Sequence, residues 1–150
     1  MTPEQVLAAV PQQKPFRFID EIVELSDTEI TGRYRFREDE FFYAGHFPGN
    51  PVTPGVILTE AMAQTGVVAL GLYLTSQTLA AEDMGSWLTL FSECQMEFRR
   101  PVLPGETVTI KGRKVYFRRM KLKSEVQLFL ANGELAAEGT LAGVGVRSDA

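Results

Sequence analysis

The feature that most constrains the fold is an apolar stretch that runs from Val56 to Leu74 in the middle of the chain. A helix over this stretch would be apolar on nearly every face, whereas a surface helix shows a polar stripe. Its length alone would also allow a membrane span. However, Glu60 and Gln64 lie in its interior, and strand-like segments flank it. We therefore predict no membrane span but a buried core helix over residues 55–74, roughly 30 Å long.

Antiparallel strands are predicted for most of the remaining chain, because apolar and polar residues alternate there. The predicted strands cover residues 16–25, 30–37, 87–99, 106–117, 122–130 and 135–146. Asn132-Gly133 favours a hairpin, since both residues tolerate positive φ. A short helix is predicted to begin at Pro3, with Thr2 as its N-cap and Gln5 completing a capping box. A curved antiparallel sheet around the central helix satisfies these patterns, which is an α+β architecture with one domain over residues 1–150.

Composition excludes several classes of protein. The single cysteine, Cys94, leaves no internal disulfide framework, and we interpret it as a small buried strand residue. No second Cys or His completes a soft metal site, so we predict no metal. The net charge of −4 and the lack of a recognition motif argue against nucleic-acid binding, although residues 111–123 hold seven cations and no acid. That stretch is either a solvated strand face or a docking patch for an acidic partner.

His46 is the only histidine, and it lies in a loop, residues 45–55, that contains three prolines and three glycines. A lone histidine is usually structural. Prolines fix φ and glycines permit unusual φ, so this loop can bend sharply and still be stiff. A stiff loop directly before the helix that carries a lone carboxylate makes His46 a candidate catalytic residue.

Glu60 is the only charged residue between His46 and Glu82. Burial without a neighbouring cation disfavours a carboxylate, so we expect a raised pKa that suits a general acid. Gln64 is four residues later on the same helix face and can hydrogen-bond the carboxyl group. Two alternatives stay open: a glutamate at the edge of a cavity, or one paired with a distant arginine.

Gly55 begins the predicted helix, so its N–H has no partner within the helix and can stabilise a developing oxyanion. An ordinary helix start is the alternative. A base, an acid and an oxyanion donor together suit β-elimination next to a carbonyl group. Such a reaction requires no metal, nicotinamide or flavin, and we expect no cofactor.

The run Gly45-His46-Phe47-Pro48-Gly49-Asn50-Pro51-Val52-Thr53-Pro54-Gly55-Val56, followed by Glu60-Ala61-Met62-Ala63-Gln64, resembles the signature of the hot-dog-fold (3R)-3-hydroxyacyl-[acyl-carrier-protein] dehydratases, in the FabZ-like branch. Segments around Pro15-Phe16 and around residues 98–106 resemble the family as well. By this resemblance, His46 and Glu60 match the catalytic pair. Gly55, Gln64, Phe47 and Val56 match oxyanion- or substrate-binding positions.

The resemblance implies a sheet wrapped around the helix and a homodimer whose active sites each take the histidine from one chain and the acid from the other. A trimer of dimers is a further expectation. It also implies an acyl carrier protein as partner and a cytoplasmic location. The candidate carrier-docking residues are Arg99, Arg100, Arg118, Arg119 and Lys121.

The expected reaction is removal of water from a 3-hydroxyacyl thioester in fatty acid synthesis or in a related polyene or polyketide pathway. A hot-dog acyl thioesterase and a non-catalytic module that binds acyl chains or carrier protein are the alternatives. Two departures from the family concern the substrate tunnel or the carrier contact. Gln12-Gln13-Lys14 replaces a frequent His-Arg pair, and Thr53 stands where a larger apolar residue is usual.

Overall fold

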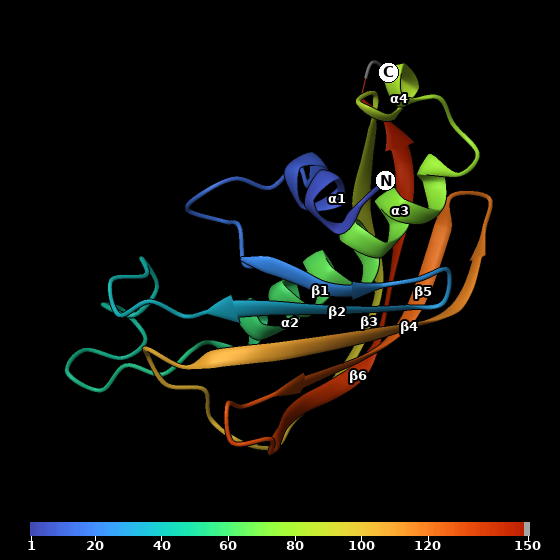
Figure 1. Ribbon diagram of the computed structural model, residues 1–150. Helices are drawn as coiled ribbons and strands as arrows, with labels where there is room; N and C mark the ends of the chain where they lie inside the picture. The colour runs from blue at the N-terminus through green and yellow to red at the C-terminus, as the bar shows by residue number, and fades with distance from the viewer. Residues whose placement is uncertain (149–150) are drawn as a thin grey trace.

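A six-stranded antiparallel sheet curves around one long helix in the computed structural model, which describes residues 1–148 (Figure 1). The helical segments are α1 (Pro3–Ala9), α2 (Gly55–Ala63), the π-helical η1 (Gln64–Ala69), α3 (Leu70–Ser76) and α4 (Ala81–Met84). The strands are β1 (Glu21–Leu25), β2 (Glu29–Arg35), β3 (Trp87–Phe98), β4 (Thr107–Arg118), β5 (Lys121–Phe129) and β6 (Leu135–Arg147). Their order in the sheet is β1-β2-β4-β5-β6-β3. The predicted α+β hot-dog architecture is confirmed.

The central helix is continuous from Gly55 to Ser76, through α2, η1 and α3. It is long and apolar enough to cross a membrane, but 67% of its most apolar window is buried inside the protein. The backbone of the helix approaches β4 closely at Gly66, because a Cβ atom on Gly112 of β4 would lie 2.8 Å from the Gly66 Cα. At Gly71 no backbone comes as close, since a Cβ there would meet only the Leu122 side chain, at 3.6 Å.

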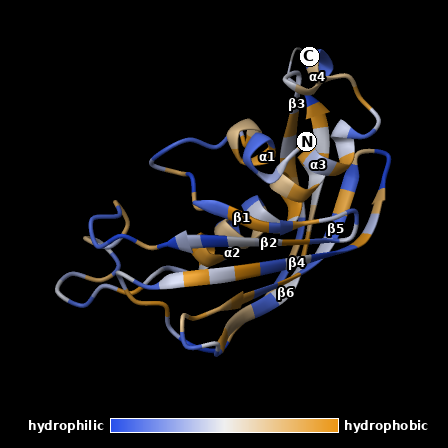
Figure 2. Cartoon of the chain, viewed as in Figure 1, coloured by the Kyte–Doolittle hydropathy of each residue, from blue (hydrophilic) through white to orange (hydrophobic). Residues whose placement is uncertain are grey.

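The strands of the second half begin and end within about two residues of the predicted bounds. Along β2, the predicted alternation is confirmed, with Ile30 and Tyr34 buried and Arg33 and Arg35 exposed. Figure 2 shows the same alternation of hydrophobic and hydrophilic bands along β4. β5 and β6 form the predicted hairpin, although only Gly133 has a positive φ, of 89°.

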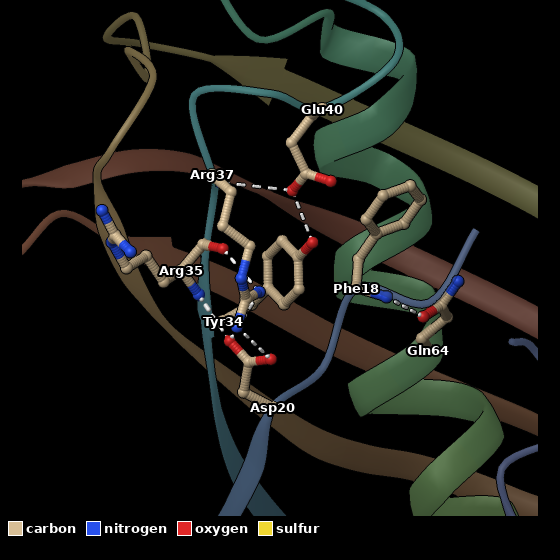
Figure 3. A network of polar contacts seen from close by, with 7 residues as sticks. All are labelled: Phe18, Asp20, Tyr34, Arg35, Arg37, Glu40 and Gln64. Carbon is tan, nitrogen blue, oxygen red and sulfur yellow. Dashed lines mark hydrogen bonds and ion pairs between the residues drawn. The ribbon is translucent and has the colours of Figure 1, made fainter. Parts of the chain in front are cut away.

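The capping box at α1 is confirmed: the Gln5 N–H donates to Thr2 Oγ1 at 3.1 Å, and the Thr2 N–H donates to Gln5 Oε1 at 2.8 Å. The predicted strand over residues 16–25 is wrong in its first half, because β1 begins only at Glu21. The Gln64 side chain accepts from the Phe18 N–H at 2.7 Å (Figure 3). It also donates to the Phe16 carbonyl at 2.8 Å. An amide side chain thus takes the place of a neighbouring strand.

β3 lies at one edge of the sheet and pairs only with β6. Most of its residues are exposed, and Leu90 and Phe91 have exposed fractions of 56% and 49%. Cys94 is also exposed, so the prediction of a buried cysteine is wrong. Alternation in a sequence does not distinguish an edge strand from a central one, and within residues 1–148 no second strand pairs with β3 on this edge.

Candidate active site

His46 lies in the loop between β2 and α2, which extends beyond the end of the sheet (Figure 1). The loop is closed around the histidine by its backbone. The His46 N–H donates to the Tyr43 carbonyl at 3.3 Å, and the Val52 N–H donates to the His46 carbonyl at 3.0 Å. The imidazole stacks on Phe47 with 4.1 Å between ring centroids, and Phe47 itself is half exposed. The predicted stiff presentation of His46 therefore has a direct structural basis.

The orientation of the imidazole is set by the carbonyl oxygen of Val52, 2.8 Å from His46 Nδ1. A carbonyl oxygen can only accept a hydrogen bond, so Nδ1 must carry the proton. In the neutral ring this leaves the lone pair on Nε2. The loop therefore presents His46 in the tautomer that a general base requires.

Glu60 is half-buried on α2, and Gln64 donates to its Oε1 at 3.0 Å, as predicted (Figure 3 shows Gln64 from close by). Burial raises the pKa of the Glu60 carboxyl group, and the hydrogen bond from Gln64 partly offsets that rise. No cation contributes to the shift. Compared with a solvent-exposed glutamate, the carboxyl group of Glu60 is therefore shifted toward its protonated form.

A cavity of about 210 Å³ lies beside Glu60. Its lining is mainly apolar: Ala63, Val67, Val68, Leu90, Phe91, Ala142 and Gly143, with Gln12 and Thr89 as the other polar residues. His46 is not among the lining residues. Glu60 therefore faces an acyl-sized apolar space, but the histidine of the same chain does not line it.

Gln12 is a residue of this cavity that the sequence argument missed. Its Oε1 is buried and has no hydrogen-bond partner within residues 1–148. The only indication in the sequence is that Gln12 belongs to the segment Gln12-Gln13-Lys14, which departs from the family. We interpret that departure as a change in the substrate tunnel or in the contact with the carrier protein. A residue with a buried, unpaired acceptor thus lines the same cavity as the acid.

Gly55 is the first residue of α2, so the predicted helix start is confirmed. A Cβ atom at this position would lie 3.2 Å from the Phe98 ring, so a larger residue here would require the half-exposed Phe98 side chain to shift. Two surface hollows flank this helix start. One, of about 430 Å³, is lined by Gly55 and Phe98, and the other, of about 460 Å³, by Val56 and Phe91. Val56 is 77% exposed at the second of these hollows.

The five candidate docking residues fall into two groups. Arg99 and Arg100 line the hollow at Gly55, whereas Arg118, Arg119 and Lys121 lie at the β4–β5 hairpin. Both groups lie beside β6: the Arg99 N–H donates to the Ala136 carbonyl, and Lys121 is in register with Val144. Since about 3.3 Å of strand separates successive residues, the two groups are about 26 Å apart along β6. One chain does not bring them into a single patch.

Three of the seven cations in residues 111–123 pair with acids from other strands. Arg113 pairs with Glu125, and Lys121 and Lys123 both pair with Glu93. Arg99 likewise pairs with Glu97 and Glu138, and Arg100 with Glu134. Such exposed pairs contribute little stability and exchange partners readily. Within residues 1–148, no group of three or more His, Cys, Asp or Glu side chains is placed to hold a metal ion.

Comparisons with known proteins show the family to which the chain is similar. Residues 10–143 match the FabA-like domain family. The chain is 36% identical over 143 residues to the 3-hydroxyacyl-[acyl-carrier-protein] dehydratase FabZ of Acetivibrio thermocellus, and 32% identical over 141 residues to that of Syntrophobacter fumaroxidans. Each alignment covers 94% of this chain and 92% of the relative.

Solved structures share the fold at low sequence identity. The dehydratase heterocomplex ApeI:P from Xenorhabdus doucetiae superposes with a TM-score of 0.79 at 14% identity, covering 99% of this chain and 94% of that one. A thioesterase from Haemophilus influenzae superposes with a TM-score of 0.68 at 14% identity, covering 99% and 92%. The fold alone is thus common to dehydratases and thioesterases.

Proposed function

The chain belongs to the family of FabA-like domains and is a 3-hydroxyacyl-[acyl-carrier-protein] dehydratase of the FabZ type, and from this premise we propose that His46 and Glu60 carry the reaction. Its substrate is a 3-hydroxyacyl group on an acyl carrier protein, and its place is in fatty acid biosynthesis. The observation that supports the catalytic assignment best is a carboxyl group with a raised pKa in an apolar cavity, held by Gln64.

The proposed chemistry follows from the groups at hand. His46 Nε2 removes a proton from the α-carbon, and the thioester oxygen gains negative charge, which the Gly55 N–H stabilises. Glu60 gives its proton to the 3-hydroxyl group, which leaves as water while the double bond forms between the α- and β-carbons. Proton transfer from the imidazolium back to the Glu60 carboxylate then restores both groups.

We propose that the active site is completed in a homodimer. The Glu60 cavity is lined by residues of β3, an edge strand with exposed Leu90 and Phe91, and His46 of the same chain does not line it. Long apolar edge strands invite pairing with another chain. A partner placed on β3 would cover these residues and can supply the missing histidine.

The catalytic roles are tested by Glu60→Gln and His46→Ala, assayed as hydration of a trans-2-enoyl thioester. We expect each variant to lose nearly all activity, because each removes one of the two proton-transfer groups, and circular dichroism should show an unchanged fold. Retention of activity by either variant would refute the assignment. Release of free thiol from an acyl thioester by the unmodified protein would instead indicate a thioesterase.

Sharing of the site between chains is tested by unfolding the two inactive variants together and refolding them. A mixed dimer has one site with both substitutions and one with neither. Random pairing makes half of the dimers mixed, so about a quarter of the original activity should return. If His46 and Glu60 of the same chain formed the site, no activity would return.

We also propose that the carrier protein docks at the hollow lined by Gly55, Arg99 and Arg100, since cations at the helix start suit an acidic partner. The hairpin residues Arg118, Arg119 and Lys121 are about 26 Å away along β6 and would contact the carrier only from the other chain. Arg100→Glu should raise KM for the carrier-bound substrate more than for the coenzyme A thioester. A cytoplasmic location and a trimer of dimers complete the proposal.

A further inference from the structure

We propose that Tyr43 and Thr53 are positioning residues that hold His46 in its base-competent tautomer through the hydrogen bond between their hydroxyl groups. This inference rests on the proposed role of His46 in the reaction. Neither residue touches the reacting atoms; both act through the backbone that surrounds the imidazole. We call this hydrogen-bonded pair, Tyr43 and Thr53, the loop clamp.

The loop clamp is a buried polar contact across the base of the His46 loop. Tyr43 Oη lies 2.7 Å from Thr53 Oγ1, and the two residues are only 5% and 4% exposed. A hydroxyl group buried to this extent without a partner would cost about 1–3 kcal/mol, so each hydroxyl holds the other in place. The contact joins positions ten residues apart, one on each side of His46.

The two residues of the clamp adjoin both groups that fix the histidine. Tyr43 supplies the carbonyl that accepts from the His46 N–H, at 3.3 Å. Thr53 directly follows Val52, whose carbonyl oxygen lies 2.8 Å from His46 Nδ1. Since the clamp fixes the separation of Tyr43 from Thr53, it also fixes the distance between the backbone that holds the histidine and the carbonyl that orients its ring.

Each side of the clamp is attached to the rigid part of the fold. The Thr53 N–H donates to the Val102 carbonyl at 2.9 Å, and the Tyr43 N–H donates to the Glu40 carbonyl at 3.2 Å. Glu40 in turn accepts from the Tyr34 hydroxyl of β2, at 2.5 Å, as Figure 3 shows. The sheet is therefore connected to the histidine through Tyr34, Glu40 and the loop clamp.

Loss of the clamp should loosen the Val52 carbonyl relative to the imidazole without removing any group that contacts substrate. A catalytic group displaced by about 1 Å can lose on the order of a hundredfold in rate. We expect Thr53→Val, which replaces the hydroxyl by a methyl group of similar size, to lower kcat about tenfold to a hundredfold. Thr53 also lines the hollow proposed for carrier docking, whereas Tyr43 lines neither that hollow nor the Glu60 cavity. The KM of Tyr43→Phe should therefore stay within about twofold while its kcat falls.

The experiment uses the fact that His46 is the only histidine, so its imidazole gives one pair of nitrogen signals in protein labelled with ¹⁵N-histidine. In the unmodified homodimer we expect the Nδ1-protonated tautomer. Thr53→Val and Tyr43→Phe should each give a mixture of tautomers, and the double variant no more than either alone, because both remove the same bond. Thr53→Ser keeps a hydroxyl and should restore both the tautomer and most of kcat.

Thr65→Val is the matched control. Thr65 is 1% exposed and its Oγ1 has no hydrogen-bond partner within residues 1–148, so the same substitution there removes no bond. Its spectrum and kcat should not change. Denaturation curves identify any variant that fails to fold, and Thr53→Ser and Tyr43→Phe then provide the comparison.

An unchanged tautomer in folded Thr53→Val and Tyr43→Phe would overturn the clamp, even if His46→Ala is inactive. A changed tautomer with unchanged kcat would confirm that the clamp holds the imidazole, and would instead refute His46 as the catalytic base. Loss of kcat with an unchanged tautomer would show that the effect does not pass through the imidazole, which also overturns the proposal.

Discussion

Replacement of Gln64 by methionine, which has similar length but no amide group, should destabilise the fold strongly. Gln64 is fully buried, and its amide bonds the Phe18 N–H, the Phe16 carbonyl and Glu60. Phe18 is fully buried as well, so its N–H cannot turn to water, at a cost of about 1–3 kcal/mol. The Phe16 residue is 43% exposed, so its carbonyl can be rehydrated at little cost. With the bond to Glu60 included, we expect the free energy of unfolding to fall by about 2–4 kcal/mol.

The assay is urea denaturation followed by circular dichroism. With a slope of about 2 kcal/mol per molar urea, the midpoint should fall by about 1–2 M. The matched control is Gln77→Met, because Gln77 follows the same helix but makes its 2.7 Å bond to Asp27 at the exposed surface. That change should cost no more than about 0.5 kcal/mol. If both variants shifted the midpoint equally, the structural role assigned to Gln64 would be wrong.

Three other predictions test the acid, the packing and the β3 edge. Burial raises the pKa of Glu60, so its contribution to stability is present below the unfolded pKa, near 4.5, and is lost as pH rises through the folded pKa. Relative to Glu60→Gln, the unmodified protein should lose about 1.4 kcal/mol of stability over this window per unit of pKa shift. Parallel curves of unfolding free energy against pH for the two proteins would contradict this. Gly112→Ala would place a methyl group 2.8 Å from the Gly66 Cα and should lower the free energy of unfolding by about 1–3 kcal/mol. Gly85→Ala is the control: a Cβ there would have no neighbouring atom within 4 Å, so the free energy of unfolding should change by at most about 0.5 kcal/mol. Leu90→Glu should yield a monomer by light scattering, since it places a charge on the apolar edge strand; a stable dimer would exclude β3 as the interface.

The parts of the structure that the sequence predicts are those that depend on local spacing. The apolar run with Glu60 and Gln64 four residues apart indicates both a buried helix and a hydrogen-bonded carboxyl group, and the structure has both. Gly66 indicates a close backbone contact, but the partner residue, Gly112, lies 46 positions away, and no local pattern identifies it. Local patterns therefore give the element and the face, and leave the contact partner open.

Long-range contacts explain the errors as well. Phe16 and Phe18 have the composition of a strand, yet their backbone groups bond a side chain from the central helix, which no strand propensity can reveal. The exposure of Cys94 follows from the place of β3 at the sheet edge, which depends on the order of all six strands. The pairing of His46 with Glu60 cannot be derived from a single chain at all if the two groups belong to different subunits.

The charge pattern shows the same limit for the partner surface. Seven cations without an acid between residues 111 and 123 indicate either a solvated strand face or a docking patch. β-Sheet pairing places Glu125 opposite Arg113 and Glu93 near Lys121 and Lys123, so three of the seven cations have an acidic partner. The acids come from β5 and β3, so a window along the chain contains none of them. Arg99 and Arg100 form exposed ion pairs too, but they line the hollow that begins at Gly55, where a thioester would enter. Proximity to the reacting groups, rather than the density of cations in the sequence, therefore favours Arg99 and Arg100 over the hairpin residues as the carrier-docking site.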